Sequence, residues 1–290
     1  MSGRRPEHGQ NFLRSRRLAR RLLANTSLSA DDLVLDIGAG TGVLTAQLSQ
    51  RCRHVVAYEV DPNVFRGLER RFRDSANVTL VHADFLTCAL PRGPYKVCAN
   101  LPFNITADVV AKLTSGVDPP QDAYLVVQRE AVQRFIPDRR RRYTLVACLL
   151  YPRWHAQVLA HIPATAFRPA PAVDAAQLHL RLRSRPLIAA RHDALFRNLV
   201  TQGYVGGTCL GRALRPLLTT RQLRRIASDL GLGLDQSPSH VRPQQWVDLL
   251  RFVLAHQHQV NLSSICRSHA RLQRRQRRLR KSHRTRSPRR

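Results

Sequence analysis

A run of four residues could make an aromatic amine reactive: Asn100-Leu101-Pro102-Phe103. An exocyclic amine on a purine base is a poor nucleophile, because its lone pair is delocalised into the ring. If the Asn100 amide oxygen and the Leu101 carbonyl accept its two N–H hydrogens, the nitrogen can become pyramidal and direct its lone pair at an electrophile. Pro102 would fix the turn, and Phe103 would give a stacking face to a base pulled out of its helix. The alternative is a structural turn beside a core phenylalanine.

A second set of residues suits a cofactor that contains adenosine. The apolar run LVLDI leads into a glycine-rich loop, 38–42, whose glycines let the backbone turn tightly and approach a ligand closely. Glu59 ends the next apolar run, where such folds use an acid to accept hydrogen bonds from ribose hydroxyls. Asp84 follows the third run, where a carboxylate could accept from an adenine amino group. Taken singly, the loop could be a simple turn and both acids surface carboxylates; together they predict a site for S-adenosylmethionine or a dinucleotide.

The elements that must position these residues alternate as in a parallel sheet covered by helices. The spacing predicts strands over Leu33–Ile37, Val55–Glu59, Val78–Val81, Lys96–Ala99, Ala123–Gln128, Trp154–Ala160 and Gln177–Leu182. It predicts helices over Val43–Ser49, Asn63–Arg71 and Ala107–Leu113. We therefore expect an α/β fold with a Rossmann-like sheet of seven strands. Glu59 and Asp84 would both lie at the carboxyl edge of that sheet.

The second half of the chain changes character after Ser184-Arg185-Pro186. Helical periodicity then predominates, over Ala194–Thr201, Arg221–Leu230 and Gln244–Ala255. Beyond residue 260 the chain is rich in arginine and has few apolar side chains, so it should be disordered when free. The predicted domains are an N-terminal arm (1–30), a methyltransferase-like domain (31–184), a small C-terminal helical RNA-binding domain (185–260) and a basic disordered tail (261–290).

The composition indicates a polyanionic partner. The formal net charge is +29, and 48 residues are Lys or Arg against 19 Asp or Glu. Such an excess creates a field that attracts nucleic acid, and arginine suits forked contacts to phosphate. A basic cluster that could grip RNA includes Arg134, Arg140, Arg141 and Arg142, although any one arginine could equally belong to a solvated face.

Other classes of site are not indicated by the sequence. The 6 cysteines contain no Cys-x-x-Cys pair and have no nearby histidine cluster, so we expect neither a metal site nor a disulfide framework. No apolar run approaches the ~20 residues that span a bilayer, and the first residues lack the apolar core of a signal peptide. We expect a cytoplasmic protein, and a monomer because the charge opposes self-association.

The sequence resembles the ribosomal RNA adenine N6-dimethyltransferases in the strings GQNFL, DIGAGTG, YEVD, ADF, NLPFNIT and AFRPAPAVDAA. The resemblance extends over nearly the whole chain up to about residue 260. Within the family it is most similar to the Erm-type enzymes, which confer resistance to macrolide, lincosamide and streptogramin B antibiotics, because it has GQNF rather than GQHF, NLPF rather than NLPY, and an arginine-rich end. The resemblance implies mono- and dimethylation of one adenine in 23S ribosomal RNA, with S-adenosylmethionine as cofactor.

The resemblance also implies roles for individual residues. Cofactor contacts would come from Asn11, Leu13, Gly38, Gly40, Glu59, Asp84 and Asn100. Asn100, Leu101 and Pro102 would present the target amine. Phe103 would stack on the flipped adenine and Phe167 would hold its other side. We expect direct in-line methyl transfer without a covalent enzyme intermediate or a metal ion.

Three alternatives remain open at this point. A small-subunit (16S) ribosomal RNA adenine dimethyltransferase would use the same chemistry in ribosome assembly. A noncatalytic RNA-binding protein could keep the fold without the reaction. A DNA adenine methylase is disfavoured, because those enzymes usually follow the acid or asparagine with Pro-Pro-aromatic, whereas Leu101 occupies the middle here.

Overall fold

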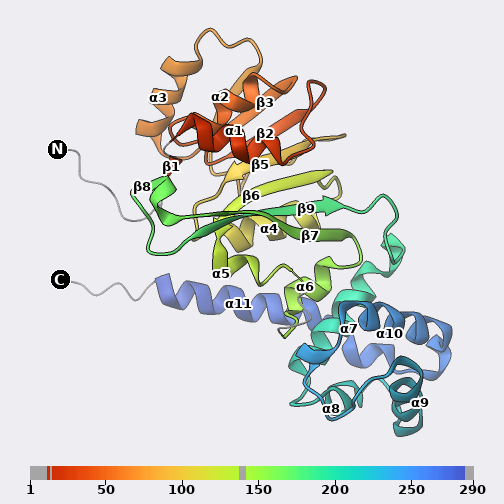
Figure 1. Cartoon of the computed structure of the whole chain (residues 1–290). Helices are drawn as coiled ribbons and strands as arrows, with labels where there is room; N and C mark the ends of the chain where they lie inside the picture. The colour runs from red at the N-terminus through yellow and green to blue at the C-terminus, as the bar shows by residue number, and fades with distance from the viewer. Residues whose placement is uncertain (1–11, 14, 137–141, 285–290) are drawn as a thin grey trace, which may run out of the picture. The chain divides into compact units, whose positions relative to one another are not determined.

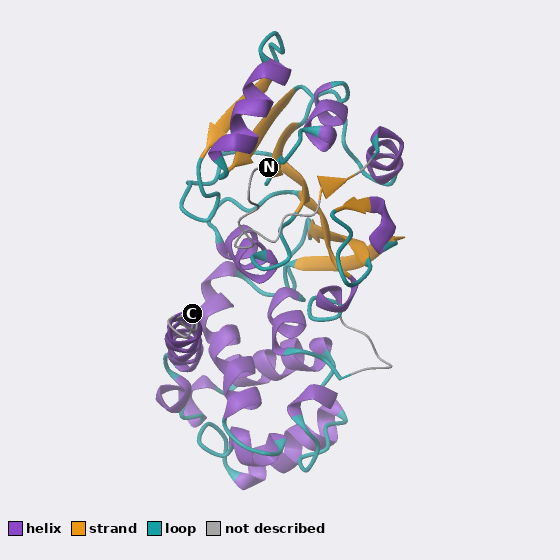
Figure 2. Ribbon diagram, turned by 90° about the vertical axis from the view of Figure 1, so that its left-hand side faces the viewer, coloured by secondary structure: helices purple, strands orange, loops and turns teal. Residues whose placement is uncertain are grey.

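The computed structural model describes residues 12–13, 15–136 and 142–284, with the backbone alone described for 277–284. The chain divides into two compact units, the first made of 1–136 with 154–184 and the second of 137–153 with 185–290. Figure 1 labels the elements, and Figure 2 shows that the strands gather in one unit whereas the other is built from helices.

The first unit is organised around a sheet of seven strands in the order β4-β3-β2-β5-β6-β9-β7. The first five strands of the chain in this sheet run parallel, and β9 pairs antiparallel with both β6 and β7. The bounds are β2 Leu33–Ile37, β3 His54–Glu59, β4 Val78–His82, β5 Lys96–Asn100, β6 Asp122–Gln128, β7 Trp154–Ile162 and β9 Ala175–Leu182. The predicted α/β fold with a seven-stranded sheet is therefore confirmed, and each predicted strand lies within two residues of an observed one at either end.

Helices connect the strands of the first unit, and their bounds are α1 Arg16–Ala24, α2 Val43–Ser49, α3 Pro62–Phe72, α4 Thr106–Ser115, α5 Arg129–Val132 and the 3-10 turn Ala164–Ala166. Helix α1 lies within the segment expected to be an arm. The Ser15 hydroxyl caps it by accepting from the Leu18 N–H (3.1 Å). Leu18 and Leu22 recur on its buried face, while its arginines stay exposed. This amphipathic pattern attaches the N-terminal segment to the core of the first unit.

A short two-stranded sheet lies outside the main sheet. Its strands are β1, Phe12–Leu13, and β8, Phe167–Arg168, which pair antiparallel with Leu13 opposite Phe167. Leu13 and Phe167 are both buried in the same apolar cluster as α1 and α2. We call this pair the β1–β8 ribbon.

The second unit is helical around a buried Trp246. Its elements are α6 Leu145–Leu150, α7 Asp193–Val205, α8 Leu210–Leu214, α9 Thr220–Leu230, α10 Pro243–Ala255 and α11 Ser268–Arg284, with 3-10 turns at Ala190–His192, Pro238–His240, Gln257–Gln259 and Leu262–Ile265. A methyl group at Gly203 would come within 2.2 Å of the Trp246 ring, so α7 approaches α10 closely only because this residue is glycine.

Residues 142–153 depart from the predicted domain boundaries. They were expected in the methyltransferase-like domain, but they belong to the second unit. The physical reason is packing, because Tyr143 and Cys148 are buried among the apolar residues of α7 and α10. The other change between units falls after Ser184, where the sequence analysis ends the first domain.

The segment expected to be a disordered tail contains α11. Polar contacts hold its first turn on α7: the His269 N–H donates to the Asn198 Oδ1 (3.1 Å), the His269 Nδ1 pairs with the Thr201 hydroxyl (3.0 Å), and the Ser268 hydroxyl donates to the Gln202 Oε1 (3.2 Å). Disorder was inferred from the scarcity of apolar side chains, and that inference was wrong for the start of this segment because hydrogen bonds anchor it. Residues 285–290 lie outside the described part of the chain.

Candidate active site

The glycine-rich loop joins β2 to α2 at the carboxyl edge of the sheet. Gly38, Gly40 and Gly42 have φ angles of +73°, +58° and +74°, in the left-handed region that favours glycine. The N–H groups of Gly38 and Ala39 both donate to the carbonyl of Tyr58 at the end of β3 (2.9 Å each). A methyl group at Gly42 would come within 2.7 Å of the Phe72 ring. The loop therefore needs glycine for both its conformation and its close packing on α3.

The predicted acids lie at the same edge. Glu59 is 2% exposed. Its Oε2 accepts from the Gly40 N–H, and its Oε1 accepts from the Val60 and Asp61 N–H groups, all at 2.9 Å. Asp84 is exposed and accepts from the Leu86 N–H through Oδ1 (2.9 Å). The Ala83 N–H donates to the Glu59 carbonyl (3.1 Å), so the two acidic residues lie on adjoining turns.

The run from Asn100 to Phe103 lies against the glycine-rich loop. It begins at the end of β5, and the Leu101 N–H donates to the Val126 carbonyl of β6 (3.1 Å). The Ile105 N–H donates to the Pro102 carbonyl (3.1 Å), which closes the turn. A methyl group at Gly38 would come within 3.3 Å of the Pro102 ring. The structure thus brings together the two motifs that the sequence singled out for cofactor and amine.

Phe12 covers the glycine-rich loop. A methyl group at Gly40 would meet the Phe12 ring at 2.6 Å, and Leu13 is buried beside it. A cavity of only about 20 Å³ is left, lined by Phe12, Leu13, Asp36, Gly38, Ala39, Thr41, Val43, Leu44 and Asn100. Sites for small ligands usually measure roughly 300 to 1,000 Å³. A cofactor can therefore enter only after Phe12 moves. Asn11, predicted to share this role, lies outside the described residues.

The two predicted base-contacting phenylalanines differ in exposure. Phe103 is half-buried at the edge of the apolar cluster. Phe167 is 1% exposed and lies inside that cluster, so it presents no face to a base in this conformation. Asp174 of the AFRPAPAVDAA string accepts from the Ala164 N–H through Oδ1 (3.0 Å), and its carbonyl accepts from the Arg129 N–H (2.9 Å). Asp174 therefore fixes the loop that carries Phe167.

Asp36 is a site residue that the sequence analysis did not single out. It lies in β2, 1% exposed, and also lines the small cavity. Burial raises the pKa of its carboxyl to about 7, although the hydrogen bond from the Thr45 hydroxyl (2.7 Å) lowers it, and the Glu59 charge raises it further. The sequence indication for this residue was an acid inside the apolar run LVLDI. In the structure, Asp36 places a carboxyl that is half-ionised near neutral pH beside the cofactor loop.

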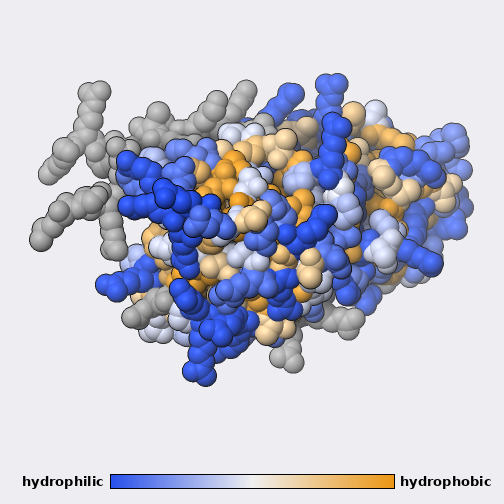
Figure 3. Space-filling model, turned by 90° about the horizontal axis from the view of Figure 1, so that it is seen from above, coloured by the Kyte–Doolittle hydropathy of each residue, from blue (hydrophilic) through white to orange (hydrophobic). Residues whose placement is uncertain are grey.

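The predicted arginine cluster is only partly described. Arg134 and Arg142 are exposed, whereas Arg140 and Arg141 lie outside the described residues. Long hydrophilic side chains project from much of the face seen in Figure 3. Within the described ranges, no group of His, Cys, Asp or Glu residues could hold a metal ion. No described helix is both long enough and apolar enough to cross a bilayer.

The residues gathered at the carboxyl edge suit S-adenosylmethionine in chemical type. The loop brings backbone within reach of a ligand at three glycines, because side chains there would clash or strain. The Glu59 carboxylate can accept from hydroxyls, and Asp36 can ionise beside a cation. The fit in volume requires the displacement of Phe12.

Comparisons with known proteins identify the family of the chain. The family model for ribosomal RNA adenine dimethylase matches residues 1–253. An rRNA methyltransferase of Streptomyces thermotolerans is 33% identical over 253 residues, 85% of this chain and 82% of that protein. A ribosomal RNA small subunit methyltransferase A of Acaryochloris marina is 28% identical over 257 residues, 84% of this chain and 95% of that protein. The crystal structure of the 23S rRNA methyltransferase ErmE superposes with a TM-score of 0.76 and 28% identity, covering 83% of this chain and 98% of that one.

Proposed function

The chain belongs to the ribosomal RNA adenine dimethylase family, and from that premise we propose that it methylates the N6 amine of one adenine in 23S ribosomal RNA. S-adenosylmethionine supplies an electrophilic methyl group carried on a positively charged sulfur. Methylation at one base, once or twice, would confer resistance to macrolide, lincosamide and streptogramin B antibiotics. The choice of 23S RNA is supported by the similarity of the whole fold to a 23S rRNA methyltransferase.

One observation carries the proposed chemistry: the turn at Asn100–Phe103 lies directly against the glycine-rich loop. The Pro102 ring is 3.3 Å from where a Gly38 methyl group would be. An amine held by the turn is therefore next to a cofactor held by the loop. Proximity of this kind accounts for a large part of a transfer reaction, because the reactants no longer need to find one another.

We assign the following roles to the residues of this turn and to Phe167. The Asn100 amide oxygen and the Leu101 carbonyl accept the two amine hydrogens, so that the nitrogen lone pair is released from the ring. Pro102 keeps the turn closed, and Phe103 stacks on the extruded base. Phe167 supports the opposite face of the base once it leaves the apolar cluster. The amine proton passes to water after transfer, since a methylated ammonium of this kind is acidic.

Cofactor binding is assigned to the residues around the loop. Gly38 and Gly40 let the backbone approach the ligand, and Glu59 accepts from its ribose hydroxyls. Asp84 accepts from its adenine amino group. Asn11 and Leu13 close over it from the N-terminal side.

RNA binding is assigned to charged surfaces of both units. We assign phosphate contacts to Arg134, Arg140, Arg141 and Arg142, and further contacts to the helical second unit. We expect the protein to work as a monomer in the cytoplasm, where its substrate is made.

Methyl transfer from labelled S-adenosylmethionine tests the proposal. The substrates are naked 23S RNA, naked 16S RNA and both assembled ribosomal subunits. Asn100→Ala is the inactive variant. Asn25→Ala is its matched control, because Asn25 is an exposed asparagine that follows α1, outside the site. We expect label at one adenine of naked 23S RNA with the parent protein and the control, and none with Asn100→Ala.

Other outcomes would change the assignment. Label confined to 16S RNA or to the small subunit would make the protein a small-subunit dimethyltransferase. No label on any RNA, together with no binding of S-adenosylmethionine, would leave a noncatalytic RNA-binding protein.

A further inference from the structure

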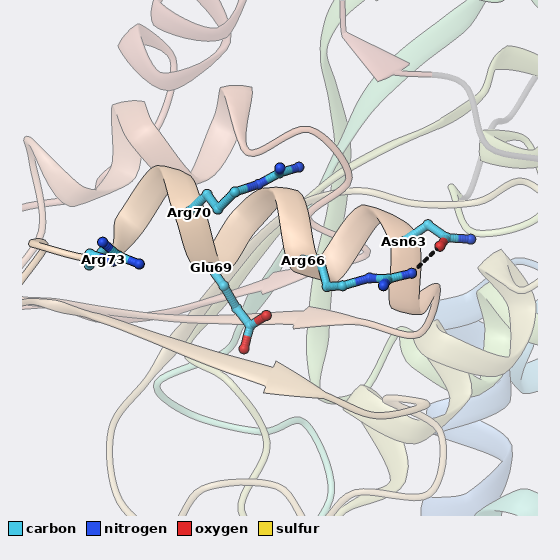
Figure 4. Close-up of a pocket in the computed structure, with 5 residues that line it drawn as sticks. All are labelled: Asn63, Arg66, Glu69, Arg70 and Arg73. Carbon is cyan, nitrogen blue, oxygen red and sulfur yellow. Dashed lines mark hydrogen bonds between the residues drawn. The ribbon is translucent and has the colours of Figure 1, made fainter.

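Two arginines of α3 and the arginine that caps its C-terminal end lie on one side of the helix, and we call them the α3 arginine stripe: Arg66, Arg70 and Arg73. They are exposed and spaced four and three residues apart, so their side chains leave the same face of the helix. Figure 4 shows them beside Asn63 and Glu69, which complete the lining of a hollow of about 630 Å³. The five lining residues are all polar or charged. Such a surface suits a charged ligand rather than an apolar one.

The positive charge of this stripe is poorly compensated. Glu69 is the acid in the hollow, and no ion pair within the described ranges joins it to the three arginines. Arg66 donates to the neutral Asn63 Oδ1 (2.5 Å). The three cations and one carboxylate leave the hollow with an excess of positive charge.

The other side of α3 packs on the glycine-rich loop. Arg71 donates to the Thr41 carbonyl within that loop (2.5 Å), and a methyl group at Gly42 would meet Leu68 and Phe72. The α3 arginine stripe therefore lies on the side of the helix that faces away from the loop.

We propose that the α3 arginine stripe binds the phosphate backbone of the RNA substrate. This inference rests on the proposed function, because RNA is the substrate. Seven residues of helix span about 10 Å. A duplex carries one phosphate per roughly 3.4 Å of axis in each strand, so the stripe can face about three phosphates.

The stripe begins near the proposed active site and extends away from it. Helix α3 begins at Pro62, three residues after Glu59, and therefore starts at the carboxyl edge of the sheet, where the glycine-rich loop and Asn100 lie. Arg66 is thus the stripe residue nearest to that edge, and Arg73 lies at the far end of the helix. Phosphate contacts fix the position and orientation of a nucleic acid on the protein, but they do not select its base sequence.

The test compares two triple variants that remove the same charge. Arg66→Gln/Arg70→Gln/Arg73→Gln removes the stripe. Arg53→Gln/Arg92→Gln/Arg181→Gln is the matched control, because these arginines are exposed and lie at or before the amino-end side of the same sheet: Arg53 precedes β3, Arg92 precedes β5, and Arg181 pairs with the first residue of β6. Binding of a 23S RNA fragment is measured at several salt concentrations without cofactor.

Three phosphate contacts predict a decrease of about 2 to 3 in the slope of log affinity against log salt for the stripe variant. The control should change the slope by less than one. Glu69→Gln should strengthen binding a few-fold at low salt, since it removes the acid in the hollow.

Equal slopes for the stripe variant and the control would overturn the inference, provided that thermal unfolding shows both variants to be folded. Unchanged or weaker binding of Glu69→Gln would also count against it. Because RNA binding is measured without methyl transfer, these results stand even if the parent protein methylates no RNA. Failure of the proposed function and failure of this inference are thus separate outcomes.

Discussion

The two edges of the main sheet both carry buried polar groups, but they are built differently. At the amino edge, His179 Nε2 and Asp122 Oδ1 lie 2.7 Å apart, and the Ser27 hydroxyl donates to the Asp122 Oδ2 (3.3 Å). The Tyr124 hydroxyl accepts from the Ser27 N–H (2.9 Å). Lys96 Nζ donates to the Ser27 carbonyl (2.8 Å) and pairs with Asp32 (2.9 Å). At this edge, side chains supply most of the partners of the buried polar groups.

At the carboxyl edge, polar groups are satisfied by bent backbone instead. Glu59 takes its hydrogen bonds from three N–H groups of loops, and the loop glycines hold left-handed angles. Asp36 keeps a carboxyl of raised pKa, and the Phe12 ring lies against Gly40. Burial of polar side chains alone therefore does not identify a functional site. A closed side-chain network stabilises the fold, whereas polar groups held by loops around a filled hollow are prepared for a ligand.

The largest expected effect is on turnover at the carboxyl edge. Asn100→Ala removes one acceptor for the target amine, so kcat should fall by about 10² to 10³. The free energy of unfolding should stay within about 0.5 kcal/mol, since Asn100 lies at the end of its strand. Single-turnover methylation and denaturant unfolding measure the two quantities. If the free energy of unfolding fell by as much as we expect for the amino-edge variants, Asn100 would be a structural residue like those of the amino edge.

The second effect is the pH dependence of stability through Asp36. In the unfolded chain its carboxyl loses a proton near pH 4, whereas burial in the folded protein raises the pKa to about 7. The folded state therefore holds an extra proton between these values, so the free energy of unfolding should fall as pH rises from 4 to 7 and stay lower above it. The decrease is on the order of 3 kcal/mol. Asp36→Asn should flatten this dependence in urea unfolding at pH 5 and 8; an identical dependence in both proteins would refute the assignment.

The third effect belongs to the amino edge. Asp122→Ala leaves the buried His179 and the Ser27 hydroxyl without their shared acceptor, so the free energy of unfolding should fall by about 2 to 3 kcal/mol. Turnover of the folded protein at low temperature should remain within twofold of the parent value. Thermal unfolding and methylation at 15 °C or so provide the readouts. A large loss of turnover in fully folded protein would show that the amino edge also contributes to activity, as the carboxyl edge does.

The smallest effect comes from a single hydroxyl of the same network. Tyr124→Phe keeps the ring that stacks on His179 (4.5 Å) but removes the acceptor for the Ser27 N–H. The expected decrease in the free energy of unfolding is about 1 kcal/mol. If the double variant Asp122→Ala/Tyr124→Phe is less destabilised than the sum of the single variants, the two residues act in one network.

The carboxyl edge could be predicted from the sequence because its residues follow apolar runs directly. Glu59 and Asn100 end their strands, Gly38 and Asp84 follow theirs within two residues, and parallel strands bring such positions to one edge. The amino edge was not predicted, since His179 meets Asp122 only through the antiparallel pairing of β9 with β6, and Ser27 reaches Asp122 from the segment after α1. Pairing between segments that are far apart in the chain leaves no pattern in the sequence of either segment.

Two other features escaped prediction for related reasons. The β1–β8 ribbon joins residues from opposite ends of the first unit, and strands of two residues have no periodicity. The anchor of α11 uses Ser268 and His269, polar residues that composition assigns to a disordered tail. In both cases the stabilising partner is remote in sequence, so the segment itself gives no indication of it.

The β1–β8 ribbon links the Phe12 ring, which lies against Gly40, to Phe167, because the neighbouring Leu13 is paired with Phe167. If the cofactor displaces Phe12, we expect this pairing to loosen and to free Phe167 for the contact with the target base that we propose. We therefore expect compulsory-order kinetics, with cofactor first and RNA second. Spent cofactor should then compete with fresh cofactor at every RNA concentration.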